Sequence, residues 1–377
     1  MNTTVSVTTT RCQRQELFWE WTERQVRRQV TDLAEKVLEM ELESHLKAGR
    51  NQRTTERRDY RNGYYGRRLT TPYGPVRIRV PRCRSRRFDA SVIFDRYQRR
   101  IADVDRILRH TYLLGVSTRG TAQLAEQIFG HSMSHQTISQ LMRWLDERLV
   151  EWRNTPIGNV YKVVYLDGMH VDIVGGDRVV MIVSGQRQAG GQLETLGFCV
   201  SKGERCVELL SDLRKRGLED VSLFVSDESG AIRHALSQVY PEVSWQSCSF
   251  HKLKTLRDDI GATDFRDQMV AEAGNIFRCP SRLAAVESAI AWSKRWKSTS
   301  GWGVQRFMDR LSDSLTFYNL PSDWWKRART NNPKERQIRT LRMRLNSMGC
   351  FHDVPAIERA VFGQLLRWHK IAITQYY

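Results

Sequence analysis

The chain has 377 residues, enough for two or three domains with a substantial core. Its hydrophobic content of 40% and its 11 Trp exclude an intrinsically disordered protein. Lys and Arg outnumber Asp and Glu by 60 to 42, which gives a formal charge of +18 and favours a polyanion as the partner.

The Cys content and the lack of long apolar segments narrow the choice of compartment. Seven Cys at irregular spacing are not the pattern of a secreted disulfide framework. No apolar stretch approaches the roughly 20 residues that span a bilayer, and residues 1–11 lack the apolar segment of a signal peptide. We expect a reducing compartment that contains nucleic acid, and no membrane association.

The N-terminal region is predicted to begin with a disordered tail, residues 1–15, followed by a helix over 16–46, where apolar residues recur at helical spacing. Residues 50–100 then contain 16 Arg and only four acids. Asn62-Gly63 is a strong turn signal, and period-two alternation on either side of residues 73–75 predicts a short hairpin.

The Arg-rich hairpin has two interpretations. It is a basic, solvated face, or it contacts a DNA backbone, which we prefer because Arg and Tyr alternate along it and Arg forms bidentate phosphate contacts. The predicted DNA contacts in this stretch are Arg61, Arg77, Arg79 and Arg82.

Residues 103–150 have a helical pattern. One helix is expected to start at residues 117–121 and to end near Gly130, and a second to start at residues 134–140. Two short helices across a Gly turn fit a helix-turn-helix, although any small helical bundle gives the same pattern. Beside the Arg-rich hairpin we favour the DNA-binding motif, with Arg119, Gln136 and Thr137 as DNA contacts.

Residues 160–245 are predicted to be α/β. A first strand ends at Asp167, strands over 170–174 and 178–183 complete an antiparallel meander, and a further strand lies around 196–200. A helix over 204–216 ends at Gly217, a strand over 223–226 ends at Asp227, and a helix over 230–239 is terminated by Pro241. This order fits an RNase H-like mixed-sheet core.

The C-terminal third is expected to be helical. A Trp-rich stretch over 252–325 reads as an all-helical insertion, in which Trp292 and Trp296 at helical spacing are more often core than ligand contacts. The final helix carries Glu335, followed by a series of Arg.

Asp167, Asp227 and Glu335 are the candidate catalytic residues. A carboxylate at the end of a buried strand is costly unless a cation neutralises it. In a basic chain, three such groups suit divalent metal beside a phosphodiester. The alternative is that the three are ordinary caps and ion-pair partners.

Several motifs in this order resemble bacterial insertion-sequence transposases of the Mutator type, within the DDE superfamily. The matching segments cover nearly the whole chain and are residues 60–64, 71–74, 80–82, 115–119, 166–168, 226–227, 246–251 and 330–336. Glu228-Ser229 departs from the family pattern, which has a small or Gly-containing turn there.

The resemblance implies an enzyme that binds double-stranded DNA, cleaves terminal inverted repeats and joins their 3′-OH ends to target DNA. It implies two Mg²⁺ ions, replaceable by Mn²⁺, on Asp167, Asp227 and Glu335. It also implies a homodimer that works in the bacterial cytoplasm, associated with the nucleoid. By the same resemblance, the cleaved strand lies along Arg339, Arg342 and Arg344.

Two pairs of residues near the predicted acids have open roles. Cys248 and His251 are spaced for one zinc ion, but four ligands are needed and no second close pair exists. We favour a supporting role, with Cys248 in the core and His251 beside the site. His170 and Asp172 share a strand face. Asp172 could reach the site from it, but we favour a solvated face.

The predicted domains are a tail (1–15), a DNA-binding region (16–155), the first part of the core (156–251), a helical insertion (252–327) and a C-terminal segment that completes the core (328–377). Two rival functions remain. One is a DNA-binding regulator without cleavage activity, and the other is an RNase H-like nuclease or resolvase that cleaves without joining strands.

Overall fold

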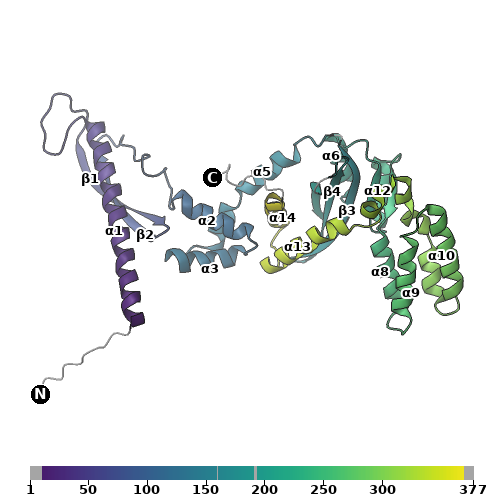
Figure 1. The fold of residues 1–377 in the computed structure, drawn as a ribbon. Coiled ribbons are helices and arrows are strands. Elements are labelled where there is room, and N and C mark those ends of the chain that lie inside the picture. Colours follow the sequence, from purple (N-terminus) through teal and green to yellow (C-terminus); the bar gives the residue numbers. More distant parts are fainter. Residues whose placement is uncertain (1–10, 159, 191–192, 369–377) are drawn as a thin grey trace, which may run out of the picture. The chain divides into compact units, whose positions relative to one another are not determined.

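The computed structural model describes residues 11–158, 160–190 and 193–368 (Figure 1). These residues form two compact units, one up to Met142 and the other from Arg143 onward. No helix in the described ranges has both the length and the apolar character needed to cross a membrane.

The first unit starts with a long helix, α1 (Arg11–Leu46), packed against a hairpin of β1 (Arg61–Thr71) and β2 (Gly74–Cys83) (Figure 1). Alternation along β2 places Ile78 and Val80 against Leu38 of α1 in one apolar cluster. Residues 11–15 are helical, which corrects that part of the predicted tail, and the rest of the tail lies outside the described residues.

The hairpin is longer than predicted, because Asn62 and Gly63 do not form a turn. Both belong to β1, at an irregularity between the pairs Arg61–Cys83 and Tyr64–Pro81. Gly63 has a φ of 71°, which Gly adopts readily, and it accommodates the irregular strand pairing rather than a turn. The chain reverses between Thr71 and Gly74.

Three helices complete the first unit, α2 (Ala102–Leu113), α3 (Thr118–Phe129) and α4 (His135–Leu141). The predicted limits of α3 and the predicted start of α4 are confirmed. The Ser117 hydroxyl accepts from the Gly120 amide, and the Ser134 hydroxyl accepts from the Thr137 amide. Gly130 ends α3 with a φ of 59°.

The second unit contains a five-stranded mixed sheet in the order β5-β4-β3-β6-β7. The pairs β3–β4 and β4–β5 are antiparallel, while β3–β6 and β6–β7 are parallel. The strands are β3 (Tyr161–Ile173), β4 (Gly176–Arg187), β5 (Glu194–Ser201), β6 (Leu223–Ser226) and β7 (Ser244–Ser247).

One strand prediction was wrong. The first strand does not end at Asp167 but continues through Gly168 to Ile173, paired with β4 along its length, so the expected first two strands are one. β7 was not predicted, because it is short and polar. Its buried Gln246 pairs with the backbone of Ser314 and Phe317.

Helices cover both faces of the sheet. Val164 and Phe224 pack with α6 (Cys206–Lys215) and α7 (Gly230–Val239), while Val163 and Val225 face the helical stretch. That stretch comprises α8 (Ser249–Ile260), α9 (Arg266–Ile276), α10 (Arg282–Trp296), α11 (Gly301–Met308), the short helices η1 (Leu311–Ser314) and η2 (Thr316–Asn319), and α12 (Ser322–Ala328).

Three further helices belong to the second unit, α5 (Trp144–Arg153), α13 (Asn332–Met348) and α14 (Val354–Trp368). α13 packs against β3, as Figure 1 shows. α14, which was not predicted, packs on α5, where Arg359 pairs with Asp146 at 2.9 Å.

Candidate active site

Two of the predicted catalytic acids occupy equivalent positions on neighbouring strands. β3 and β6 are parallel, and Tyr165 is in register with Val225. Asp167 is two residues beyond Tyr165 on β3, and Asp227 is two residues beyond Val225, directly after the end of β6. Since side chains alternate along a strand, Asp167 shares the sheet face of Tyr165, which is the face covered by α8 to α12. The charges of both Asp167 and Asp227 act on His251 of α8.

Cys248 and His251 enter the same site from the sheet edge. The Cys248 amide donates to the Ser226 carbonyl at 2.7 Å, directly before Asp227, and Cys248 precedes α8. Interaction with Cys248, followed by the negative charges of Asp167 and Asp227, raises the pKa of His251 to about 8 despite its burial. The imidazole is therefore largely protonated at neutral pH.

The helix that carries Glu335 is fixed to the site by Asn331, a buried residue. Its side-chain amide donates to the Leu166 carbonyl at 3.2 Å, and its backbone amide lies 3.2 Å from Cys248 Sγ. The Glu335 amide donates to the Asn331 carbonyl at 3.0 Å, so Glu335 follows one turn after this anchor. Neither Asn331 nor this link was predicted, although Asn before a helix is a recognisable N-terminal signal.

Glu228, which departs from the family pattern after the second acid, is held in place by a local ion pair. Glu228 Oε1 lies 3.0 Å from Nζ of Lys252, which is only 5% exposed, and 3.1 Å from the Ser247 hydroxyl. Lys252 also donates to the Asp309 carbonyl at 2.6 Å. The turn after Asp227 is thereby held without a Gly.

The donor set of this site suits a hard divalent cation. The predicted ligands Asp167, Asp227 and Glu335 are carboxylates, and Asn331 Oδ1 is buried without a hydrogen-bond partner among the described residues. The Glu335 side chain is exposed. The carboxylate oxygens of these three acids do not all lie within 4.8 Å of one another. The group of described metal-ligating residues whose ligand atoms do so lies in the first unit.

The predicted Arg of α13 lie on its outer side. Ile338, Leu341 and Leu345 are buried, whereas Arg339, Arg342 and Arg344 are exposed. The first two form no ion pair with a described residue. The helix therefore turns a basic face to solvent.

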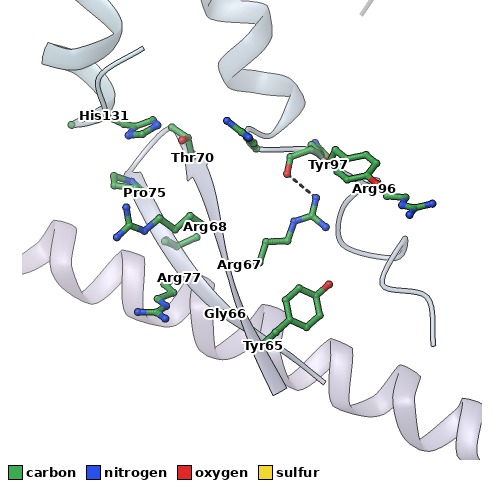
Figure 2. A pocket seen from close by; sticks show the side chains of 14 residues that line it. Tyr65, Gly66, Arg67, Arg68, Thr70, Pro75, Arg77, Arg96, Tyr97 and His131 are labelled. Atoms are coloured by element: carbon green, nitrogen blue, oxygen red, sulfur yellow. Dashed lines mark hydrogen bonds between the residues drawn. The ribbon is translucent and has the colours of Figure 1, made fainter. Parts of the chain in front are cut away.

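In the first unit, an open cleft of about 1050 Å³ lies beside the hairpin (Figure 2). Its lining includes Arg68 and Arg77 from the hairpin, Arg96 and Tyr97 from the following loop, and His131 after α3. These three Arg form no ion pair with any described residue. Arg67 supports the loop by donating to the carbonyls of Asp95 and Gln98 at 2.7 and 2.8 Å.

The structure separates the predicted Arg contacts of the hairpin into two groups. Arg61 pairs with Glu39 and Glu43 of α1, and Arg79 pairs with Glu35 at 2.7 Å, so both tie the hairpin to the helix. By contrast, Arg77 lines the cleft and Arg82 lies over the Tyr65 ring at 4.6 Å.

The remaining predicted residues have simpler surroundings. Arg119 and Gln136 are exposed, and Thr137 is half-buried with its hydroxyl 3.0 Å from Ser134. On β3, His170 and Asp172 are both solvated, and His170 pairs with Asp177 at 2.8 Å.

Comparisons with known proteins identify the family. A family model described as "Transposase, Mutator family" matches residues 1–370. The transposase for insertion sequence element ISRM5 of Rhizobium meliloti (strain 1021) is 28% identical over 351 residues, covering 92% of this chain and 88% of the relative. The transposase for insertion sequence element IS406 of Burkholderia multivorans (strain ATCC 17616 / 249) is 30% identical over 354 residues, covering 88% and 87%.

A solved structure, the Drosophila P element transposase strand transfer complex, matches 75% of this chain and 81% of its own at 12% identity, with a TM-score of 0.29. The family assignment rests on the sequence relatives, which are transposases. The chain belongs to the Mutator family of transposases, which confirms the resemblance seen in its motifs.

Proposed function

We propose that this chain binds the DNA ends of its insertion sequence, cleaves them and joins them to target DNA by a two-metal, DDE-type mechanism. The proposal is supported by the position of Asp167 on β3 and of Asp227 directly after the neighbouring parallel strand β6, with His251 close enough to feel both charges. The strand order, with an antiparallel meander followed by two parallel strands, supports an RNase H-like core.

Asp167, Asp227 and Glu335 would hold two Mg²⁺ ions, with Mn²⁺ as a substitute, because these ions prefer oxygen ligands. Bound ions would lower the pKa of the attacking water or 3′-hydroxyl and stabilise the leaving oxygen. The exposed Glu335 side chain has the freedom to adjust to them.

The other residues of the site position the acids and receive the phosphodiester. Asn331 holds the start of α13 against β3, and Lys252 neutralises Glu228. The protonated His251 adds a positive charge beside the two aspartates, where it favours a phosphate group. The exposed Arg face of α13, including Arg339 and Arg342, is placed to track the DNA strand that is cut.

DNA binding is assigned to the first unit, within the region 16–155. The cleft with Arg68, Arg77 and Arg96 would take the backbone, and Arg119, Gln136 and Thr137 of the helix-turn-helix would approach base edges. Two transposon ends must be held together, so the working form would be a homodimer, acting on the bacterial nucleoid. Residues 156–251 and 328–377 would form the core, interrupted by the insertion 252–327.

The decisive experiment is cleavage and joining of a labelled end fragment of the parent element with Mg²⁺, Mn²⁺ or EDTA. We expect metal-dependent nicking and joined products, reduced at least about 100-fold, or about 2.7 kcal/mol, in Asp227→Asn and Glu335→Gln. DNA binding should be unchanged in both variants. Asp172→Asn, which alters an exposed acid of the same strand, is the matched control and should retain activity.

The rival functions are distinguishable outcomes. Nicking without joining would identify a nuclease, and tight binding of the end fragment without nicking would identify a regulator. Full activity in either variant would remove the altered acid from the catalytic set.

A further inference from the structure

A second group of metal-ligating side chains lies in the first unit. His45 is in the last turn of α1, Asp59 precedes β1, and Cys83 ends β2. One ligand atom from each, all within 4.8 Å of one another, makes this the one such group of three among the described residues. The three ligands come from separate segments, so their meeting is a property of the fold.

The backbone around these residues is held in place by hydrogen bonds. The Arg58 amide donates to the Leu46 carbonyl at 3.0 Å, which ties the segment before Asp59 to the end of α1. The Arg84 amide donates to the Tyr60 carbonyl at 2.8 Å, which ties the end of β2 to the same segment. The positions of the ligands are therefore set before any ion binds.

The Asp59 carboxylate is further oriented by two backbone amides. Oδ1 accepts from Tyr60 at 2.7 Å and Oδ2 accepts from Ser85 at 3.0 Å. The carboxylate is thereby fixed close to the thiol and the imidazole.

The surroundings resemble those of a structural metal site. Cys83 is fully buried and packs with Leu42, Leu46 and Phe88. The His45 ring meets the Phe88 ring edge-on at 6.0 Å between centroids. Apolar surroundings on the Cys83 side strengthen the attraction between a thiolate and a cation, while His45 and Asp59 are only partly buried and leave an open side.

We propose that His45, Asp59 and Cys83 bind one Zn²⁺ ion, with a fourth position left to water. Nitrogen, oxygen and sulfur together suit zinc, whereas Mg²⁺ and Ca²⁺ prefer oxygen alone. Tetrahedral zinc places its ligand atoms about 3.4–3.8 Å apart, given bonds of about 2.0–2.3 Å, and the three atoms, which lie within 4.8 Å of one another, would draw together to that spacing on binding. This site is independent of the proposed catalytic function.

The consequence would be structural. The ion would fasten the C-terminal end of α1 to the base of the hairpin that carries Arg77. Zinc binding would therefore stabilise the first unit, because an ion that binds the folded state alone raises stability by mass action.

The test is a Co²⁺ titration of the metal-stripped full-length chain, followed by competition with Zn²⁺. We expect one equivalent of Co²⁺ to produce a thiolate-to-cobalt charge-transfer band, which Zn²⁺ then removes. Cys83→Ser should abolish the band. Cys248→Ser and Cys350→Ser are the matched controls and should retain it, since Cys248 lies in the catalytic unit and Cys350 is exposed.

His45→Gln provides a second variant, because this side chain is only partly buried and its replacement leaves the apolar cluster intact. It should weaken Co²⁺ affinity by more than about 100-fold, because loss of a direct ligand costs more than the about 10–100-fold typical when a partner of a ligand is replaced. It should also abolish the Zn²⁺-dependent rise in Tm. A missing band in the wild-type chain, or a band lost in Cys248→Ser and kept in Cys83→Ser, would overturn the proposal.

Discussion

At the scale of single residues, neighbouring side chains decide what each charged group can do. His251 is surrounded by Cys248, Asp167 and Asp227, which favour its protonated form. The Arg of the hairpin differ in the same way, because Arg79 has an acidic partner on α1 and Arg77 has none among the described residues.

The raised pKa of His251 predicts how the stability of the chain depends on pH. The folded value of about 8 exceeds the ordinary 6.5, so the stability that His251 contributes is complete below pH 6.5. That contribution is lost as the pH rises through about 8. Histidine NMR titration of the metal-free chain in EDTA should show this pKa, and Asp227→Asn should lower it. Asp172→Asn should leave it unchanged. An unshifted His251 in Asp227→Asn would remove the Asp227 charge from the causes, which Cys248 leads.

Arg77 and Arg79 form a matched pair for DNA binding. Arg77→Ala should weaken binding and reduce the slope of log K against log salt by about 0.9, because one phosphate contact is lost. Arg79→Ala should leave the slope nearly unchanged and instead lower the Tm slightly, since Arg79 already pairs with Glu35. Binding isotherms at several salt concentrations, together with thermal unfolding, separate the two effects. Equal slope changes in both variants would refute this division.

At the scale of elements, the attachment of α13 to the sheet is the decisive feature of the site. Asn331 reaches both the Leu166 carbonyl on β3 and the Cys248 sulfur before α8. The third acid therefore depends on a neutral amide for its position.

Replacing this anchor should affect both stability and catalysis. Asn331→Ala leaves a buried carbonyl without its donor and should lower the free energy of unfolding by about 1–3 kcal/mol. It should also strongly reduce strand cleavage in conditions where the chain remains folded. Asn346→Ala, in the exposed part of the same helix, is the control for denaturant unfolding and cleavage assays. A variant at Asn331 with normal cleavage would show that the anchor does not position Glu335.

The elements that sequence reasoning predicted correctly are those whose limits are set locally. Both limits of α3 and the start of α4 were found because Ser117, Gly130 and Ser134 cap their own helices. Asn62-Gly63 was wrongly predicted to be a turn because pairing with β2 overrode the local turn preference. The first strand of the core was predicted too short because pairing with β4 continues it past Gly168. β7 was not predicted because its Gln246 is buried by partners about 70 residues further along the chain. Contacts over such a separation leave no local sequence pattern.

The candidate site shows the same division. Asp167 and Asp227 were predictable because each follows an apolar run. Asn331, Lys252 and Glu228 were not, because their roles depend on contacts between distant segments.

At the scale of the whole molecule, the helical insertion and the sheet share one apolar core. Val163 and Val225 pack in the same cluster as Trp292 and Trp296, so the preference for core Trp is confirmed. Trp302, by contrast, is 68% exposed. The sheet and the insertion should therefore unfold together.

Hydrogen exchange measures this cooperativity. Trp292→Ala should destabilise the second unit by about 3–5 kcal/mol and speed amide exchange in β3 and β6 as well as in α9 and α10. The amides of the hairpin in the first unit should be unaffected, because it has its own core. Trp302→Ala is the surface control and should change exchange little. Faster exchange confined to the helices would show that the insertion is a separate folding unit.

The order of the site residues along the chain has a consequence for synthesis. A ribosome completes the hairpin and the capped helices early, but Glu335 emerges only after the whole helical insertion. On the proposed function, an incomplete translation product would recognise transposon ends and lack the means to cut them. Premature termination would thus generate a competitor of the intact enzyme, so that errors of translation would restrain the mobility of the element.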